Sequence, residues 1–431
     1  MKDSLENPSS ATRFGIETFG KFLGGDRQAI LTIANSRWAF WAGAILVLAA
    51  GFAREYDGES LWDEPWHLAI PFGASLVAAT SLYLLVFVAA AIRGQPLVRF
   101  FSGWYRFVGL FWMTAPLAFL YAVPYERLFS EVGAVQANLW TLAVVALWRV
   151  VLMARVIQVV FNWYPVASGI ITVFFADVIA VIVAATFEFP VAMIAIMGGV
   201  RYTPAEMLLS EVGMLFQIIS FLLLPFVLAA AVGMCISRHK LKPILTESCL
   251  NSRITPSLWA VVLASLLVWL PILPGPQREQ RLRFQVESRM TSNRIAEALK
   301  ILDQHSSDDF PPHWSPPPRV AYSTNNPPLK QVLIGVAKME PRLNPTWEDV
   351  FATKARSAVE VFNILELSPE DLEAYTTWLE RIPLGPKIAT RHLYRIEGNQ
   401  TIHESLQALA DRIKVVAQKA PHKHPLDDWD D

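Results

Sequence analysis

Seven apolar runs dominate this sequence and constrain its fold more than any other feature. They cover roughly residues 38–53, 68–92, 107–123, 139–159, 167–186, 212–236 and 257–273. A transmembrane helix needs about 20 mostly apolar residues, so the first, third and seventh runs are short for a span and the others are comfortable. The runs predict an all-α, polytopic membrane protein with about seven transmembrane helices.

Composition agrees with this prediction. Only 17% of the residues are charged, whereas a soluble domain has about 25%. Many of the tryptophans stand beside the ends of apolar runs, where amphipathic rings settle at a lipid–water interface. The net charge of −1 gives no indication of nucleic-acid binding. The tryptophans concerned are Trp38, Trp41, Trp62, Trp66, Trp104, Trp163 and Trp259.

The basic residues predict the orientation of the chain. Residues 1–37 lack the compact apolar stretch of a cleavable signal peptide, so the first run itself acts as the insertion signal. With this N-terminal segment in the cytoplasm, the predicted outside loops carry one arginine each, and most of the predicted inside segments carry several basic residues. A run at 190–200 is too short to span alone and is read as re-entrant or interfacial. Counting it as a span would also break this pattern. The outside arginines are Arg54, Arg127 and Arg201.

The side of the C-terminal domain depends on conflicting signals. Seven spans place it outside the inner membrane, whereas five arginines between 278 and 294 favour the inside. Long domains translocate largely regardless of their charge, so the short loops decide and the outside is predicted. If the run at 257–273 only dips into the membrane, the domain is cytoplasmic instead.

From about residue 275 the chain turns polar, and its apolar residues recur at helical spacing. We expect a small helical soluble domain over 275–420, with a proline-rich strap at 308–328 and a disordered tail at 421–431. Thr346 and Ser368 are the predicted N-caps of two of its helices. The expected helices cover 277–304, 329–339, 347–366, 369–382 and 400–419.

The N-terminal segment holds one further expected helix, at 14–33. Its apolar residues Phe19, Phe22, Leu23, Ile30 and Ile33 share roughly one face, which predicts a helix lying on the inner membrane surface. The sixth span is expected to begin near 204, after Thr203, with Pro225 inside it.

Two charges in neighbouring apolar runs are the leading candidate site. Arg149 lies about 15 residues before the short turn at 162–166, and Asp177 lies about 13 residues after it. At about 1.5 Å of rise per residue, an antiparallel hairpin brings both to the same depth, near the middle of the bilayer. We expect a buried ion pair, with Gln217 and Arg155 as polar neighbours. One alternative is a polar pathway for protons, an ion or a solute, which normally needs more polar groups at depth than these runs supply. The other is that the two charges face different neighbours, such as Gln217.

Other candidate sites are weaker. The loop at 54–67 carries five acids and His67, but it lacks the acid at the final position of a calcium loop, so an acidic surface loop is preferred over a cation site. The tail histidines His422 and His424, with Asp427 and Asp428, lie too close in sequence to share a helix face. No catalytic, phosphate-binding or metal-ligating motif is present, so we expect no enzyme activity, no cofactor and no bound metal.

Part of the chain resembles a known family. The basic approach VRFFSGWYRF (98–107), Pro116 within the third run, and LWRVVLMARVIQVV (147–160) before a short turn are similar to Yip-type polytopic membrane proteins. The resemblance covers about a fifth of the chain. It implies a role in membrane trafficking or organisation and no catalytic residues, and it does not extend to the C-terminal domain.

These observations predict a non-enzymatic integral membrane protein: a scaffold, assembly factor or sensor. Its partners are the lipid bilayer and a protein bound through residues 275–420, and nucleic acid is not expected. The alternative function is a secondary transporter or channel subunit that uses Arg149 and Asp177 at the membrane midplane.

Overall fold

The described residues are mostly helical, and the chain divides into two compact units. The computed structural model describes residues 13–95, 99–186, 204–236, 252–318, 327–358, 364, 367–397 and 404–418. The division between the units falls at Gln277–Arg278, close to the boundary at about 275 that the change in polarity predicts. Helix α13 (Pro274–Thr291) begins in the first unit and continues into the second.

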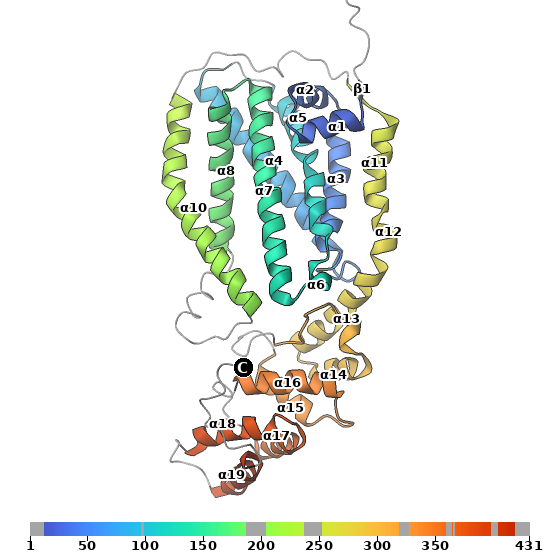
Figure 1. Cartoon of the computed structure of the whole chain (residues 1–431), viewed down its shortest axis with the longest axis vertical. Coiled ribbons are helices and arrows are strands. Elements are labelled where there is room, and N and C mark those ends of the chain that lie inside the picture. The colour runs from blue at the N-terminus through green and yellow to red at the C-terminus, as the bar shows by residue number, and fades with distance from the viewer. Residues whose placement is uncertain are drawn as a thin grey trace, which may run out of the picture. The chain divides into compact units, whose positions relative to one another are not determined.

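The first unit is built from long apolar helices that run side by side (Figure 1). Six helices among the described residues are long and apolar enough to cross a membrane, and a pair bent by 58° at 273 makes up to seven. Five of the predicted runs coincide with α3, α4, α7, α8 and α10. The helices are α3 (Trp38–Glu55), η1 (Pro65–Leu68), α4 (Ala69–Ile92), α5 (Phe100–Trp112), η2 (Ala115–Ala122), α6 (Tyr125–Leu128), α7 (Glu131–Phe161), α8 (Pro165–Thr186), α10 (Pro204–Ile236), α11 (Pro256–Leu267) and α12 (Trp269–Ile272).

The third candidate span, Phe100–Leu128, contains the predicted run at 107–123 and is built from α5, η2 and α6 in series. Helix α5 ends at Trp112, and the 3₁₀ helix η2 continues after a turn with Pro116 in its first positions. Proline lacks the N–H that would continue an α-helix. The hydroxyl of Thr114 donates to the Phe111 carbonyl oxygen at 2.6 Å, so this polar side chain is satisfied locally. The predicted start of α10 at 204 is confirmed, and Pro225 lies inside that helix.

The core of the first unit is rich in aromatic side chains. Phe40 in α3 stacks on Tyr105 with ring centroids 4.6 Å apart, and it lies 4.7 Å from the Trp112 ring. Both partners come from α5, so these contacts join α3 to α5. Trp112, Phe107 and Tyr83 are fully buried. Burying such large rings is a main source of packing energy in any core.

The N-terminal segment forms two short helices instead of the single helix predicted at 14–33. Helices α1 (Ile16–Leu23) and α2 (Arg27–Ala34) are separated at Gly24 and Gly25, and Gly25 has φ of 79°. Glycine tolerates this left-handed conformation, which ends a helix. The residues of the predicted apolar face are nevertheless removed from solvent. Leu23 is partly buried, and the other four are buried: Phe19, Phe22, Ile30 and Ile33.

A two-residue strand ties this segment to the rest of the unit. Strand β1 (Arg13–Phe14) pairs in parallel with β2 (Arg253–Ile254), which directly precedes α11. Residues more than 200 positions apart in the sequence are therefore joined by backbone hydrogen bonds.

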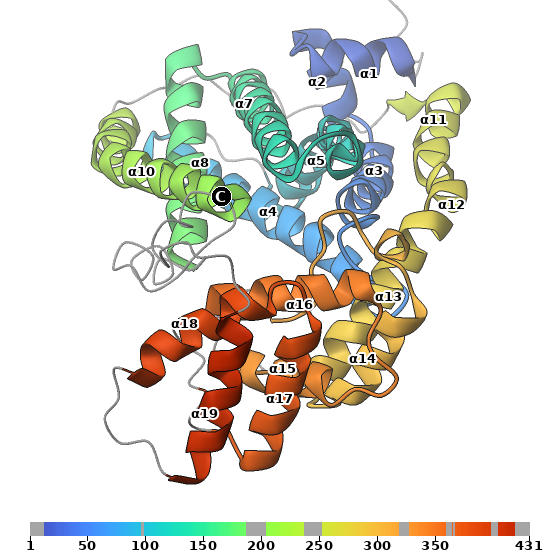
Figure 2. The ribbon, with the colours of Figure 1, turned by 60° about the horizontal axis from the view of Figure 1, so that its bottom comes forward.

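The second unit is a bundle of shorter helices in which α17, α18 and α19 pack against one another (Figure 2). The predicted helix at 277–304 is divided at Asn293, which has φ of 59°. Helix α18 was not predicted at all. The elements after α13 are α14 (Ile295–Gln304), η4 (Ser307–Asp309), α15 (Leu329–Ala337), α16 (Pro345–Ala358), α17 (Pro369–Arg381), α18 (Gly385–Glu397) and α19 (Glu404–Ala417).

One of the two predicted N-caps is confirmed. The Ser368 hydroxyl accepts a hydrogen bond from the Asp371 N–H at 3.1 Å, at the start of α17. The prediction for Thr346 is wrong, because α16 already begins at Pro345. The side chain of Asn344 instead accepts a hydrogen bond from the Thr346 N–H at 3.1 Å.

A buried glutamate organises the core of the second unit. Both carboxylate oxygens of Glu348 accept hydrogen bonds from Arg342, at 3.0 and 2.8 Å from its Nε. The indole N–H of Trp378 donates to the same carboxylate at 3.2 Å. The neighbouring Trp347 donates its indole N–H to the His305 carbonyl oxygen at 2.9 Å. Glu348 is only 3% exposed. Its buried negative charge is balanced by Arg342, and Trp378 supplies a further hydrogen bond.

Candidate functional site

Arg149 occupies the interior face of α7, but its partner is an aromatic ring. Helix α7 begins after Ser130, whose hydroxyl accepts a hydrogen bond from the Gly133 N–H, and it ends at Asn162 with φ of 54°. The guanidinium carbon of Arg149 lies 4.5 Å from the centroid of the Phe111 ring in α5. Its Nε is buried without a hydrogen-bond partner. A cation over a ring face is attracted by the ring quadrupole, so the charge is stabilised without a carboxylate.

Asp177 is buried in α8, and the predicted ion pair with Arg149 is not formed. The residue is 6% exposed, and its Oδ2 atom has no hydrogen-bond partner. Both residues belong to the described chain, in which no ion pair or hydrogen bond joins them. The physical reason is geometric: spacing along a hairpin determines depth, but the direction of each side chain around its helix depends on helix rotation. Arg149 is directed toward α5 and not toward the carboxylate.

The predicted polar neighbours do not complete a site around this pair. Gln217 is half-buried on α10. Arg155 instead fixes the turn between α1 and α2, because its Nε donates to the Gly25 carbonyl oxygen at 3.0 Å. Its Nη1 donates to Gln158 Oε1 at 2.7 Å. The assignment of Arg155 as a neighbour of Arg149 and Asp177 is therefore corrected to a structural tie for the N-terminal helices.

The loop between α3 and η1 is more highly organised than its acidic sequence predicts. The side chain of Gln277, which is 1% exposed, holds this loop through three hydrogen bonds. Its Nε2 donates to the carbonyl oxygens of Tyr56 and Glu59, each at 2.9 Å, and its Oε1 accepts from the Leu61 N–H at 2.7 Å. Within the loop, the Ser60 hydroxyl donates to Asp63 Oδ2 at 2.7 Å. The backbone at 56–61 is thus fixed by a residue more than 200 positions away.

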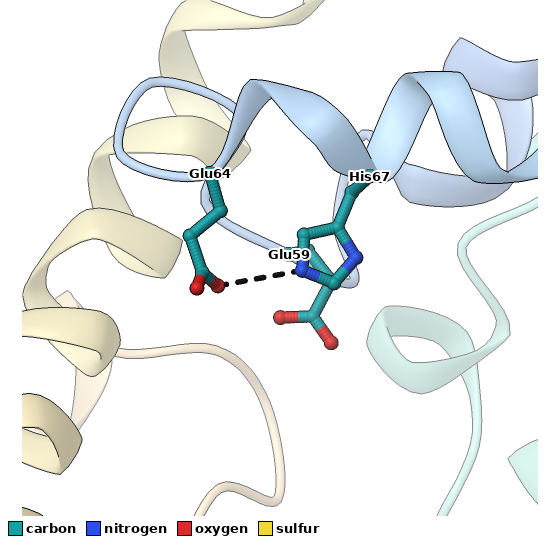
Figure 3. A group of neighbouring side chains, drawn as sticks. All are labelled: Glu59, Glu64 and His67. Carbon is teal, nitrogen blue, oxygen red and sulfur yellow. Dashed lines mark ion pairs between the residues drawn. The ribbon is translucent and has the colours of Figure 1, made fainter.

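Three side chains of this loop converge on one point: Glu59, Glu64 and His67 (Figure 3). One ligand atom from each lies within 4.8 Å of the others, and the three residues are partly exposed. His67 Nε2 is 3.4 Å from Glu64 Oε2, and these side chains are 25% and 26% exposed. The spacing of Glu64 and His67 in sequence could have indicated this pair, whereas the contribution of Glu59 depends on how the loop closes. The sequence predicts no bound metal. Among the described residues, this cluster is the group whose donor atoms could hold one.

The carboxyl group of Asp57, in the same loop, has a raised pKa. Burial, together with the negative charge of Glu126, raises the pKa of Asp57 to about 6. The adjacent Tyr56 is buried and donates its hydroxyl to the Ala122 carbonyl oxygen at 3.1 Å. Asp57 therefore titrates near pH 6, where an ordinary aspartate is almost fully ionised.

Some predicted features lie outside the described residues. These are the run at 190–200, the tail with His422, His424, Asp427 and Asp428, and part of the proline-rich strap. Comparison of the chain with protein families, curated proteins and solved structures finds no match. The resemblance to Yip-type proteins accordingly stays a prediction.

Proposed function

We propose that this chain is an integral membrane protein whose first unit crosses the bilayer. The exposed surface of α10 supports this. Of its 33 residues, only Ala205, Ser220, Ala231 and Met234 are buried, while Phe216, Phe221 and Phe226 are among the many large apolar side chains left exposed. Such an apolar surface is stable in lipid and strongly unfavourable in water.

The proposed orientation keeps the N-terminal segment in the cytoplasm and places the C-terminal unit outside. It rests on the arginine counts of the short loops, with Arg54 and Arg127 in the poorly charged outer loops. Reporter fusions after residue 300 and at the C-terminus test this. A reporter that is active only in the cytoplasm should be silent at both positions, and activity at either would reverse the assignment.

We propose further that the protein acts without catalysis, as a scaffold, assembly factor or sensor that binds a protein partner through its C-terminal unit. The observation that carries this proposal is that the unit has its own hydrophobic core and a polar surface. Among its described large apolar residues, Val415 is the one that is strongly exposed. Such a unit is built as a water-soluble module attached to the membrane unit.

The alternative is a transporter or channel subunit. One observation favours it: Asp177 is buried at depth with an oxygen that lacks a partner, and an intramembrane carboxylate of this kind often marks a proton or ion path. Two observations count against it. Arg149 is directed toward Phe111 and not toward Asp177. Gln217 is then the one predicted polar neighbour left for Asp177, whereas a polar pathway normally needs several such groups.

Complementation distinguishes the two functions. A host lacking this chain is supplied with the wild type, with a chimera in which 278–431 is replaced by an inert helical domain, or with Asp177→Asn. The scaffold proposal expects the chimera to fail and Asp177→Asn to restore growth or morphology, provided both reach wild-type membrane levels. The opposite pattern, an active chimera and an inactive Asp177→Asn, would establish the transport alternative.

A further inference from the structure

We propose that Glu59, Glu64 and His67 bind a divalent first-row transition-metal ion, with Zn²⁺ as the representative case. This inference is independent of the proposed scaffold role, because it concerns the loop between α3 and η1 and not the C-terminal unit. It would give the first unit a ligand-binding function of its own.

The donor set matches this class of metal. Imidazole nitrogen and carboxylate oxygen are both ligands of Zn²⁺, and a site with three protein ligands leaves a fourth position for water or a ligand. Bonds of about 2.1 Å place two tetrahedral ligand atoms about 3.4 Å apart. Glu64 Oε2 and His67 Nε2 already have a separation of 3.4 Å, and all three ligand atoms lie within 4.8 Å of one another. Small side-chain rotations, mainly of Glu59, bring them onto one ion.

The backbone that carries these ligands is fixed independently of any metal. Gln277 accepts from the Leu61 N–H and donates to the Glu59 carbonyl oxygen, so it holds the segment beside the first ligand. The Glu64 N–H donates to the Ser60 carbonyl oxygen at 2.8 Å, and the His67 N–H donates to the Glu64 carbonyl oxygen at 3.2 Å. These turns set the positions of the other two ligands. Preorganisation of this kind lowers the ordering cost of binding.

The surroundings favour a cation and leave it accessible. The carboxylate of Glu55 interacts electrostatically with His67 and Glu59, while Arg54 forms an ion pair with Glu55 at 3.4 Å. Negative charge gathered in one loop raises the local concentration of cations. The side chains of Glu64 and His67 are about one quarter exposed, so an ion can exchange with solution.

The same chemistry disfavours calcium. Ca²⁺ takes six to eight oxygen ligands and rarely uses imidazole, whereas this cluster offers one nitrogen and two carboxylates. Imidazole nitrogen suits Zn²⁺, Cu²⁺ and Ni²⁺. The site is therefore expected to distinguish Zn²⁺ from Ca²⁺ at equal concentration.

Isothermal titration of the full chain in lipid nanodiscs with Zn²⁺ tests the proposal. We use a His422→Gln/His424→Gln background, so that the tail histidines do not contribute. One ion per chain should bind, and Glu64→Gln or His67→Gln should weaken binding at least about tenfold. His305→Gln is the matched control, because His305 also lies near a carboxylate, Asp309, at 3.7 Å, but belongs to no group of three such side chains among the described residues. It should leave the affinity unchanged.

Two results would overturn the proposal: unchanged Zn²⁺ affinity in both loop variants, or equally tight binding of Ca²⁺ by the parent. Each variant is checked for folding by its elution volume and unfolding midpoint. If the loop variants fail this check, X-ray absorption at the zinc edge decides with the parent protein alone. Scattering from one imidazole and from oxygen ligands supports the site, and a spectrum with no imidazole or with sulfur rejects it.

Discussion

Gly43 in α3 lies directly against Gly109 in α5. A Cβ atom added to Gly43 would be 3.3 Å from the Gly109 carbonyl oxygen and 2.7 Å from the Cβ of Trp112. A Cβ added to Gly109 would be 3.1 Å from the backbone nitrogen of Phe40. The two glycines thus lie at one crossing of α3 and α5, where the absence of side chains lets the backbones approach. Small residues have this role wherever helices pack in lipid.

Alanine at either glycine should destabilise the first unit. Because the obstructing atoms of Gly43→Ala are backbone and Cβ atoms, which cannot move aside, we expect a loss of about 1–3 kcal/mol, or a midpoint about 5 °C lower. The measurement is thermal unfolding of the purified protein in detergent. Gly169→Ala in α8 is the control, since a Cβ there meets nothing within 4 Å. An unchanged midpoint for both Gly43→Ala and Gly109→Ala would contradict the close crossing.

Arg149 and Asp177 should behave as energetically independent residues. Since Arg149 lies over Phe111 and no ion pair joins it to Asp177, a double-mutant cycle of Arg149→Met and Asp177→Asn should give a coupling below about 0.5 kcal/mol. For the same reason, exchanging the two charges should not restore stability. A cycle of Arg149→Met with Phe111→Leu is the positive control and should show the larger coupling. Coupling above about 1 kcal/mol between the two charges would instead indicate an ion pair.

The protonation of Asp57 should make stability fall as the pH rises. Its folded pKa of about 6 exceeds the ordinary value of 3.8, so the folded state holds the proton more tightly than the unfolded state. The free energy of unfolding therefore decreases between about pH 4 and pH 6, by at most about 3 kcal/mol for a shift of about two units. Asp57→Asn, which cannot ionise, should remove this part of the pH dependence. The check is the unfolding midpoint at pH 4.5 and 7.5 for both proteins, and equal slopes would disprove the assignment.

Glu348→Gln should destabilise the second unit by about 2–4 kcal/mol. The change removes one charge from a buried group that binds Arg342 and Trp378, and breaking one side of such a pair is costly. Hydrogen exchange of the full chain reports this as faster exchange across α16 and α17. Glu370→Gln is the matched control, because Glu370 is 85% exposed and its pair with Lys338 is a surface ion pair. Similar exchange in the two variants would refute a central role for Glu348.

Gln277→Ala should loosen the loop that carries the proposed metal ligands. Three hydrogen bonds to the backbone at 56–61 would be lost, so hydrogen exchange there should accelerate whether or not a metal binds. If the metal proposal is correct, Zn²⁺ affinity should also fall about tenfold, as is usual for residues that support ligands. Slow exchange at 56–61 in this variant would mean that other contacts hold the loop.

Much of the helical layout could be predicted from apolar run length alone. The runs at 68–92 and 139–159 fall on α4 and α7, and Ser368 caps α17 as its hydroxyl and the following proline indicate. Local signals of this kind depend only on nearby residues. The break at Thr114 and the turn at Gly24 and Gly25 were missed in detail, because proline and glycine signal an interruption but not its geometry.

The candidate sites were harder to predict. His67 and Glu64 are close in sequence, but the order of their loop depends on Gln277, which no local pattern connects to it. The pairing of Arg149 with Asp177 was a wrong prediction for a related reason. Counting residues from the turn predicts the depth of each charge in the membrane. The neighbour that each side chain contacts also depends on the rotation of its helix.

The amino-acid sequence by itself determined that this chain forms long apolar helices and a separate polar helical unit, because hydrophobic run length and helical periodicity are local properties. The tertiary structure decided which side chains meet. The approach of Gly43 to Gly109, the position of Arg149 over Phe111 and the convergence of Glu59, Glu64 and His67 all depend on how helices rotate and where loops close. Packing between distant segments sets those quantities, so they become visible only when the whole chain is folded.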